Sequence, residues 1–464
     1  MDYKDRVGKN FFLRTINIDD ISFDILDFFE LDIRRYPFLL ESSAVGNDRA
    51  RFSILFSKPN IQLIKKKKDD NINFLKELDL KFKKGKVSQE KIYIDKNITL
   101  PFTGGWFLYL GYELVSEIEH KIKIPESPFQ LPTAFLARVK NTIIFDQKEK
   151  KLYLVSEESM KEVEKMYTDF KTIKKPRKKN IYLKNNIKIT KKGSDLTHNK
   201  DVNKCIDYIF QGEIFQANLS RLWEFNIDKT ISNLDIYRQL RITNPSPFAG
   251  IVNISNSCII SSSPERLACL KGEFLETRPI AGTRPRGSNG FMDIELSREL
   301  ISSEKERAEH LMLVDLERND ISRVCQYGSV KVDEMMVIES YSHVHHIVSN
   351  IKGKIKRGVK IGEIISAVFP GGTITGCPKV RCMEILGELE KIGRGPYTGS
   401  FGYINHFGDL DLNILIRTMV RENETLSLRA GGGIVADSIP DKELLETEAK
   451  ANGMLKALQK INYK

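Results

Sequence analysis

The stretch TRPIAGTRPRG (277–287) is followed closely by SSEKERAEHLMLVDLERND (302–320). The first combines arginines with prolines and glycines, and the second is dense in charged residues. Pro279 and Pro285 exclude the first segment from a helix interior, so we predict a loop there. In the second segment, serines precede a run rich in Glu, Arg and Leu, which is the pattern of an N-capped helix. The sequence therefore predicts a basic loop followed by a helix with an acidic first turn.

Two pairs of glutamates are spaced so that each pair shares one face of a helix. Glu306 and Glu309 are three positions apart in the helix just described. Glu443 and Glu446 have the same spacing in IPDKELLETEAKANGML, where the proline suits a helix start, and Lys450 follows four positions after the second glutamate. Both segments are therefore predicted to present paired carboxylates on one helix face.

Four carboxylates from two helices suit Mg²⁺, which prefers oxygen ligands and keeps positions open for an anionic substrate. The alternative is that both pairs are solvated helix faces, and for either pair alone this is the commoner case. The occurrence of both pairs, with glycine-rich segments between them, favours the metal.

Composition sets broad limits on the class of protein. The chain has 464 residues, 41% hydrophobic and 29% charged, which is ordinary for globular domains. No apolar run reaches the length of a membrane span, and the N-terminus lacks the apolar core of a signal peptide, so we expect a cytoplasmic protein. The six cysteines form no CxxC pair and are interpreted as reduced packing residues.

The net charge of +11 is concentrated in lysine runs at Lys65–Lys68 and Lys171–Gly193. Such runs can bind nucleic acid, but these lack interleaved aromatic residues, so we interpret them as solvated and expect neither nucleic acid nor membrane as a partner. The second run suggests a boundary. We predict an N-terminal part at 1–170, a basic linker at 171–196 and a catalytic domain at 197–464.

Hydrophobic periodicity indicates strands throughout, with helices interspersed mainly in the second half, and by itself supports only an α/β or α+β class. One long strand is expected at Asp411–Val420, with Arg417 inside it. Another is expected at Thr425–Ala430. An arginine inside an apolar strand needs an anionic partner, so Arg417 is either a structural ion pair or a clamp for a substrate carboxylate.

Two glycine-rich segments could hold anions. FPGGTITGCPKVRCMEIL (369–386) leads into a helix, whose preceding amides and Thr373 could bind an anion. In RAGGGIVADS, the residues Gly431–Gly433 are predicted to form a second loop whose amides approach a carboxylate closely. Tight turns are the alternative for both. GxxxxGK[ST] is absent, so phosphate transfer is not supported.

Side chains suited to proton transfer stand near strand ends. Glu265 follows a predicted strand in SSSPERL and could act as a general acid. SHVHHIVS (342–349) offers histidines for a weak zinc site or for proton transfer, with His343 and His345 on one side of a strand and His346 on the other. With Tyr397, this set suits a small polycarboxylate bound to magnesium.

The motifs PIAGTRPRG, ERAEHLMLVDLERND, VHH, FPGGTITGCPKVRCMEI, GSFGYI, IRT and GGGIVADS, in this order, resemble the chorismate-utilising enzymes over Thr197–Leu458. RYPFLLESSAVGNDRARFSIL (35–55) and LPFTGGWFLYLGYEL (100–114) resemble the N-terminal part of the ammonia-using branch. The resemblance implies an α+β fold with two antiparallel sheets packed face to face and helices outside.

The resemblance also implies roles. Glu309 and Glu446 match magnesium ligands, with Glu306 and Glu443 as neighbours. Glu265 matches the acid that assists departure of the 4-hydroxyl, and His346 a residue beside the ring. The implied substrate-binding groups are Gly282, Thr283, Thr373, Tyr397, Arg417, Gly431, Gly432, Gly433 and Lys450.

Gln216 stands where water-using relatives carry a lysine that activates water. A neutral amide cannot act as that base, so ammonia is the expected nucleophile, and Gln216 joins the catalytic set. The chain shows no evident glutaminase with a cysteine nucleophile. The resemblance therefore implies a separate glutamine amidotransferase subunit as partner.

Two products are compatible with this branch. Ala281 stands where many aminodeoxychorismate synthases carry a lysine nucleophile, which favours anthranilate and pyruvate. Other segments resemble the aminodeoxychorismate synthases more closely, and 4-amino-4-deoxychorismate, for 4-aminobenzoate and folate, is the product we expect. A regulatory tryptophan pocket is also implied, at Leu40, Glu41, Ser42, Pro245 and Ser246.

Overall fold

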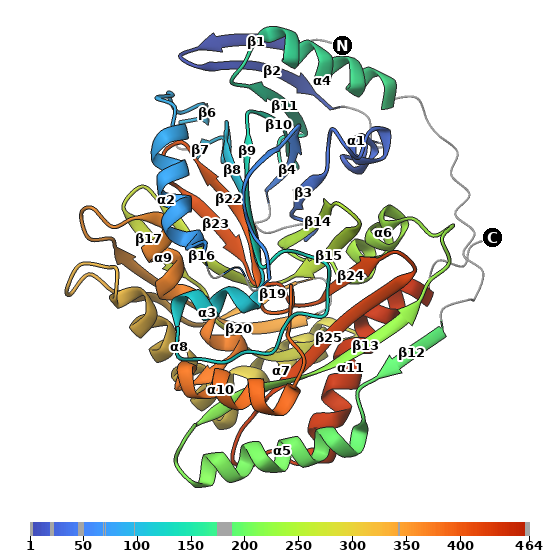
Figure 1. The fold of residues 1–464 in the computed structure, drawn as a ribbon, viewed down its shortest axis with the longest axis vertical. Coiled ribbons are helices and arrows are strands. Elements are labelled where there is room, and N and C mark those ends of the chain that lie inside the picture. Colours follow the sequence, from blue (N-terminus) through green and yellow to red (C-terminus); the bar gives the residue numbers. More distant parts are fainter. Residues whose placement is uncertain are drawn as a thin grey trace.

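The computed structural model describes residues 3–18, 23–44, 51–67, 69, 71–96, 98–173, 188–341 and 344–459. Within these ranges, no helix is both long enough and apolar enough to cross a membrane. Strands form two large sheets, and most helices lie on their outer sides (Figure 1). This confirms the α+β class and the two-sheet architecture that the resemblance implied.

Neighbouring strands in the first sheet run antiparallel. Their order is β1 (Tyr3–Gly8), β2 (Phe11–Asn17), β11 (Lys151–Ser156), β10 (Asn141–Asp146), β4 (Phe52–Ser57), β3 (Phe38–Glu41), β14 (Phe248–Ile254), β15 (Ser257–Ser263), β24 (Thr418–Glu422), β25 (Thr425–Ile434), β13 (Gln216–Asn226) and β12 (Lys188–Lys192), with β21 (Gly376–Cys377) also on β13.

The second sheet is antiparallel as well. Its order is β18 (Ile280–Pro285), β20 (Val344–Lys354), β17 (Phe274–Thr277), β16 (Arg266–Lys271), β23 (Leu410–Asn413), β22 (Ser400–Asn405), β8 (Gly105–Leu110), β9 (Ala134–Val139) and β5 (Asn60–Lys65), with β19 (Lys331–Ser340) also on β20. A separate small ribbon pairs β6 (Tyr93–Asp95) with β7 (Ile98–Thr99).

Helices cover the outer faces of the sheets. Apolar residues of α1 (Leu26–Leu31), α4 (Met160–Ile173), α6 (Asn233–Thr243) and α11 (Pro440–Gln459) pack on the first sheet. Those of α2 (Phe74–Gly85), α8 (Glu304–Ser322) and α9 (Ile361–Val368) pack on the second. The remaining helices are α3 (Val115–Ile118), α5 (Asp195–Phe210), α7 (Gly290–Ser302) and α10 (Lys379–Glu390), with the 3-10 turns η2 (Tyr112–Leu114) and η3 (Gly372–Ile374).

Large aromatic side chains fill the core between the two sheets. Phe38 of β3, in the first sheet, stacks on Phe107 of β8, in the second, with ring centroids 4.5 Å apart. Phe56 of β4 contacts the same ring edge-on at 5.3 Å. Because these side chains come from facing strands, the sheets are packed face to face, and burying rings of this size is the main stabilising contribution at the interface.

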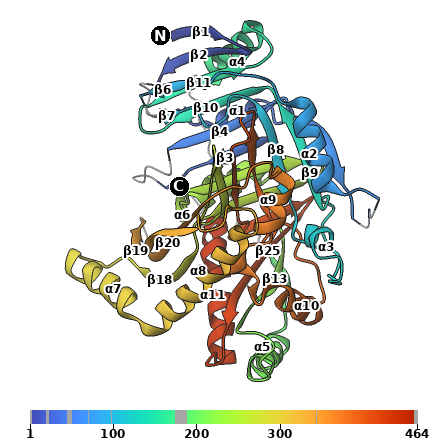
Figure 2. The ribbon, with the colours of Figure 1, turned by 90° about the vertical axis from the view of Figure 1, so that its left-hand side faces the viewer.

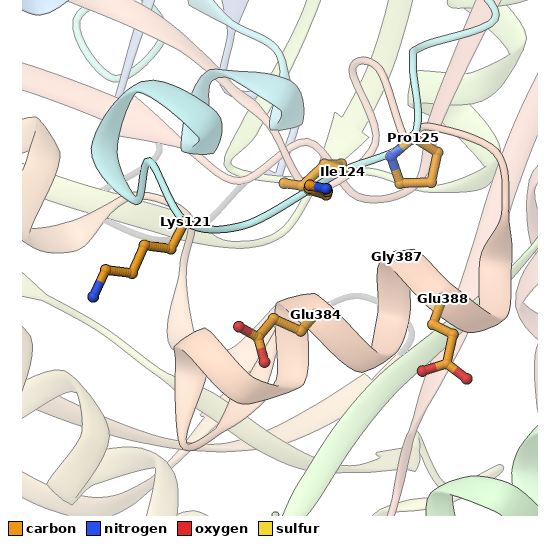
Figure 3. A pocket seen from close by; sticks show the side chains of 7 residues that line it. Lys121, Ile124, Pro125, Glu384, Gly387 and Glu388 are labelled. Atoms are coloured by element: carbon orange, nitrogen blue, oxygen red, sulfur yellow. The ribbon is translucent and has the colours of Figure 1, made fainter.

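Strands of the first 170 residues pair with strands of the later part in both sheets: β3 with β14, and β8 with β22. An open groove also lies between residues 121–125 and α10, and Figure 3 shows Ile124 and Pro125 on one side of it and Glu384 and Glu388 of this helix on the other. A Cβ at Gly387 would lie 3.2 Å from the Lys123 carbonyl oxygen, so the glycine allows this close approach. The predicted domain division stays a prediction, and residues 174–187 of the predicted linker lie outside the described residues.

The prediction of a loop over 277–287 is wrong for its central part. Ile280–Pro285 forms β18, which pairs with β20. β18 ends the second sheet in the strand order, and an edge strand tolerates prolines because one row of its backbone groups needs no partner. The predicted helix is confirmed as α8, where Ser303 rather than Ser302 is the N-cap and accepts a hydrogen bond from the Glu306 amide.

The single strand predicted at Asp411–Val420 is also wrong. Leu410–Asn413 is β23 of the second sheet, whereas Thr418–Glu422 is β24 of the first. Residues 414–417 cross from one sheet to the other, and Arg417 at the end of the crossing has a φ of 49°. An apolar run looks continuous in sequence because both strands and the crossing are largely buried.

Candidate active site

One cavity of about 720 Å³ collects every catalytic, substrate-binding and metal-ligating residue predicted from the sequence. Its walls come from α8, α11, β13, β18, β20 and β25, which lie in the lower half of the molecule in both views (Figures 1 and 2). The lining residues among the predictions are Gln216, Glu265, Gly282, Thr283, Glu306, Glu309, His346, Thr373, Tyr397, Arg417, Gly431, Gly432, Gly433, Glu443, Glu446 and Lys450.

The four glutamates of α8 and α11 face this cavity together. Burial raises the pKa of Glu309, and the charge of Glu306 adds to the effect. Burial likewise raises the pKa of Glu443, with Glu446 contributing. Carboxylates that repel one another in a partly buried place are stabilised by a divalent cation.

Other groups already contact these carboxylates. Lys450 lies 2.7 Å from Glu446, and Arg284 lies 3.3 Å from Glu306. Among the described residues, no three histidine, cysteine, aspartate or glutamate side chains are grouped so that they could hold a metal ion by themselves. The four glutamates are the residues of this cavity whose oxygens could serve Mg²⁺, an ion that also takes water or substrate oxygens as ligands.

Gly431–Gly433 is not the predicted loop but the last part of β25. The three glycines pair with Asn218, Leu219 and Ser220 of β13, and this part of β25 carries no side chains. β24 pairs with β25 only as far as Leu428, so the other edge of the glycine segment is open.

Hydrogen bonds fix which amides face that open edge. The amides of Asn218 and Ser220 point away from β25, to the Thr375 carbonyl and the Glu390 carboxylate. By the alternation of an antiparallel ladder, their partners Gly433 and Gly431 also direct their own amides away from β13. Both amides are thus open on a strand edge, instead of the predicted loop, and their binding of an anion stays a prediction.

Glu265 is buried at the end of β15, where the Thr373 hydroxyl donates a hydrogen bond to its carboxyl at 2.8 Å. Its backbone is held on both sides, since its amide donates to the Ser263 hydroxyl and its carbonyl accepts from the Ile414 amide. Burial raises the pKa of Glu265 to about 7, against the opposing effects of Thr373 and Arg417. A carboxyl with this pKa can donate a proton at neutral pH.

Arg417 lines the cavity, and no ion pair or hydrogen bond of its side chain is found in the described part of the chain. Burial lowers its pKa, opposed by Glu265. A half-buried guanidinium without a partner carries an unfavourable desolvation cost. Of the two interpretations left open by the sequence, this geometry favours a clamp for a substrate carboxylate.

His346 of β20 faces the cavity, where its Nδ1 lies 2.9 Å from the Thr283 hydroxyl. Burial lowers the pKa of His346 to about 4, so the ring is neutral at neutral pH. His345 points the other way, to Ser340 and Asp293. His343 lies outside the described residues. The described histidines therefore place one neutral ring at the site.

Tyr397 and Lys450 border the glycine strand. Burial raises the pKa of the Tyr397 hydroxyl to about 12, so it stays protonated and can donate. The Lys450 ammonium donates to the Gly431 carbonyl at 2.8 Å. Beside them, Arg429, which also lines the cavity, and the buried Arg394 both pair with the carboxylate of Glu390, each at 2.8 Å. This buried network supports the wall of the cavity.

The residues predicted to form a tryptophan pocket are divided between two cavities. Leu40, Glu41 and Ser42 line a second cavity of about 790 Å³, whereas Pro245 lines the first. Ser246 connects the two segments, because its carbonyl accepts a hydrogen bond from the Ser43 amide. Glu41 is buried and bound by Tyr237 and Arg241. Binding of tryptophan stays a prediction.

Sequence reasoning missed several cavity residues, among them Asn218, Arg284, Lys305 and Arg429. Asn218 was recognisable, since it lies two positions after Gln216 in a predicted strand and therefore on the same face. The two arginines and the lysine carry no such signal, because a single charged residue is usually solvated.

A family model described as chorismate binding enzyme matches residues 36–456. Aminodeoxychorismate synthase component 1 from Bacillus subtilis (strain 168) is 38% identical over 449 residues, covering 92% of this chain and 92% of that protein. Anthranilate synthase component 1 from Bacillus pumilus is 35% identical over 482 residues, covering 96% and 91%.

Solved structures agree on the fold. Anthranilate synthase component I from Streptococcus pneumoniae TIGR4 superposes with a TM-score of 0.75 at 30% identity, covering 95% of this chain and 98% of that one. The menaquinone-specific isochorismate synthase from Escherichia coli superposes with a TM-score of 0.70 at 16% identity, covering 96% and 95%, which shows the shared fold alone.

Proposed function

This chain belongs to the family of chorismate-binding enzymes, and on that basis we propose that it is an aminodeoxychorismate synthase component I. It converts chorismate and ammonia to 4-amino-4-deoxychorismate, the precursor of 4-aminobenzoate. The observation that carries the proposal is that Glu265, with a pKa of about 7, faces the same cavity as the neutral amide of Gln216. Amination of chorismate requires an acid that protonates the leaving hydroxyl, which Glu265 supplies. It also requires that no base activates water, and Gln216 stands at the position of that base.

The residues of the cavity have different roles in this reaction. Arg417, Tyr397 and the amides on the open edge of β25 bind the carboxylates of chorismate. Glu265 gives its proton to the 4-hydroxyl as the carbon–oxygen bond breaks, so water leaves instead of hydroxide. Ammonia supplies the electron pair of the new carbon–nitrogen bond, and the amine keeps the extra proton. Glu265 then regains a proton from solvent before the next turnover.

Magnesium is proposed as the cofactor. Glu309 and Glu446 would hold it, with Glu306 and Glu443 as neighbours, and the bound ion would supply positive charge to a substrate carboxylate. The raised pKa values of Glu309 and Glu443 support this, since they reflect burial beside other carboxylates. In return the cation would favour the ionised forms of Glu309 and Glu443.

A separate glutamine amidotransferase is proposed as the source of ammonia. Relatives of the chain are named as component 1, which supports a second component. The cysteines do not provide a nucleophile of their own: five of the six are buried, and burial raises the pKa of the half-buried Cys377 thiol.

Anthranilate synthesis, with release of pyruvate, is the second candidate. It is favoured by Ala281, which supplies no side-chain nucleophile for a covalent intermediate, and by relatives that carry this name at nearly equal identity. In that reaction ammonia attacks ring carbon 2 directly. For 4-amino-4-deoxychorismate, Ala281 implies that another transient nucleophile, such as a first ammonia, replaces the lysine.

The test of amination is isotopic. The purified chain is incubated with chorismate, Mg²⁺ and ¹⁵N-labelled ammonium chloride, and products are analysed by mass spectrometry. We expect one ¹⁵N atom in the product and no reaction without ammonium. Consumption of chorismate to an oxygen-containing isomer, without ¹⁵N, would refute amination.

A further inference from the structure

Two carbonyl oxygens stand out on the wall of the cavity. Gln216 Oε1 and Asn218 Oδ1 are buried, and neither has a hydrogen-bond partner within the described ranges. Both side chains line the cavity, with exposed fractions of 4% and 9%. Buried acceptors are normally satisfied, and those left unpaired at a functional site indicate a ligand that supplies the missing donors.

The two amides are placed side by side by strand geometry. They are two positions apart on β13, so their side chains project from the same face of the first sheet. Ser220 is next in this row, and its hydroxyl is already paired with Glu390 at 2.7 Å and Arg429 at 2.8 Å. The row therefore passes from two unpaired acceptors to a fully paired hydroxyl.

The orientation of the first amide is fixed by its neighbour. Gln216 Nε2 donates to Glu309 Oε1 at 2.9 Å. A carboxylate can only accept here, so the amide nitrogen must face Glu309 and the amide oxygen must face elsewhere. Glu309 thus holds the amide so that Gln216 directs its oxygen, an acceptor, away from α8.

Two glycines of the neighbouring strand β25 leave space for the Gln216 and Asn218 side chains. A Cβ at Gly433 would overlap Gln216 Nε2, and a Cβ at Gly431 would lie 2.9 Å from Asn218 Oδ1. The missing side chains at these two positions let both amides lie over β25, close to the edge whose amides are proposed to bind a substrate carboxylate. The acceptors and the substrate site therefore share one surface.

We propose that Gln216 Oε1 and Asn218 Oδ1 form a subsite for the attacking ammonia. Ammonia has three N–H donors and one lone pair, so two neutral acceptors can hold it by its hydrogens and leave the lone pair free for the ring carbon. A lysine or another donor here would compete for that lone pair. A carboxylate would instead favour ammonium, which has no lone pair. The proposal rests on the amination proposed above and adds Asn218 as a residue that selects the nucleophile.

The test is steady-state kinetics of Asn218→Leu, which keeps the approximate shape and removes the acceptor. Rates are measured against ammonium chloride at saturating chorismate, and then against chorismate at saturating ammonium. We expect the KM for ammonium to rise about tenfold or more, as for loss of a hydrogen bond in a buried site, and the KM for chorismate to stay within about twofold. An unchanged KM for ammonium, or a parallel rise for chorismate, would overturn the assignment.

Two further variants separate this role from a structural one. Asn141 on β10 is also buried with an unpaired Oδ1 but does not line the cavity, so Asn141→Leu should alter thermal stability and leave the KM for ammonium unchanged. Asn218→Asp keeps two acceptors and should retain the parent KM for ammonium, with a lower kcat because ammonium is held protonated. A KM for ammonium as poor as that of Asn218→Leu would count against the subsite. If the parent chain makes no aminated product, the proposed function fails, and not the subsite alone.

Discussion

The Thr373 hydroxyl donates a hydrogen bond to Glu265 Oε1 at 2.8 Å, from the turn that precedes α10. This bond stabilises the ionised carboxylate, whereas burial of Glu265 destabilises it. Burial is the larger effect, and the pKa of Glu265 settles at about 7. The carboxyl is thus poised to give up a proton at neutral pH and to be protonated again afterwards.

Replacing Thr373 by Val removes this hydrogen bond and keeps the burial. Because the bond lowers the pKa of Glu265, its loss raises that pKa further. Activity requires the protonated acid, so kcat of the parent chain should fall as pH rises through about 7, and the fall should move to higher pH in Thr373→Val. A pH profile of kcat at saturating chorismate and ammonium measures this. A shift to lower pH would contradict the assignment.

Glu265 should also make the fold less stable at high pH. The folded chain keeps this proton up to about pH 7, whereas an unfolded glutamate loses it near pH 4.5. Between these values the folded state binds more protons, so the free energy of unfolding decreases as pH rises. Glu265→Gln removes the effect and should be more stable than the parent at pH 8, by at most about 3 kcal/mol.

Urea unfolding of both chains at pH 5 and pH 8 measures this difference. The gain from Glu265→Gln should be smaller at pH 5 than at pH 8, because pH 5 lies only just above the pKa of 4.5 of the unfolded glutamate while the folded glutamate is still protonated. The variant should be inactive at either pH. Equal gains at the two pH values would mean that titration of Glu265 is not the cause.

The sequence predicted the residues of the site more completely than it predicted the helices and strands on which they lie. Paired glutamates on α8 and α11 were predictable, because three-residue spacing places side chains on one helix face wherever the helix lies. Arg417 was recognised as important, but its place on a crossing between sheets was not, since strand periodicity cannot tell which sheet a buried strand joins. Gly431–Gly433 looked like a loop because glycine is depleted in strands, and only pairing with β13 keeps it extended.

The tertiary arrangement also decided which polar groups are left unpaired. No local sequence pattern indicates that the Gln216 amide nitrogen donates a hydrogen bond to Glu309, a residue 93 positions away in sequence. The same holds for Arg429, whose partner Glu390 comes from α10. Contacts of this kind depend on how distant elements pack, and the family resemblance supplied roles for residues but not these partners.

Gly433→Ala should inactivate the enzyme by displacing Gln216. A methyl group at this position would overlap Gln216 Nε2, so the amide would have to leave Glu309 or β25 would have to shift. We expect kcat/KM for ammonium to fall at least tenfold. Gly290→Ala is the matched control, because a Cβ there meets nothing within 4 Å and should leave activity unchanged. Full activity in Gly433→Ala would show that the amide needs no fixed position.

Glu309→Ala and Glu446→Ala should each abolish turnover and weaken magnesium binding. Calorimetric titration of Mg²⁺ into the chain with chorismate bound provides a readout that is independent of catalysis. Glu304→Ala is the control, since Glu304 lies in the first turn of α8 but does not line the cavity. If either cavity variant bound Mg²⁺ as the parent does and stayed active, the proposed ligand role would be wrong.

The most direct measurement is the identity of the product. The purified chain is incubated with chorismate, Mg²⁺ and excess ammonium chloride, while anthranilate fluorescence and released pyruvate are followed. We predict loss of chorismate without either signal, and formation of 4-aminobenzoate and pyruvate once aminodeoxychorismate lyase is added. Anthranilate formed together with an equal amount of pyruvate, before any lyase is present, would contradict the proposed product and identify the chain as an anthranilate synthase.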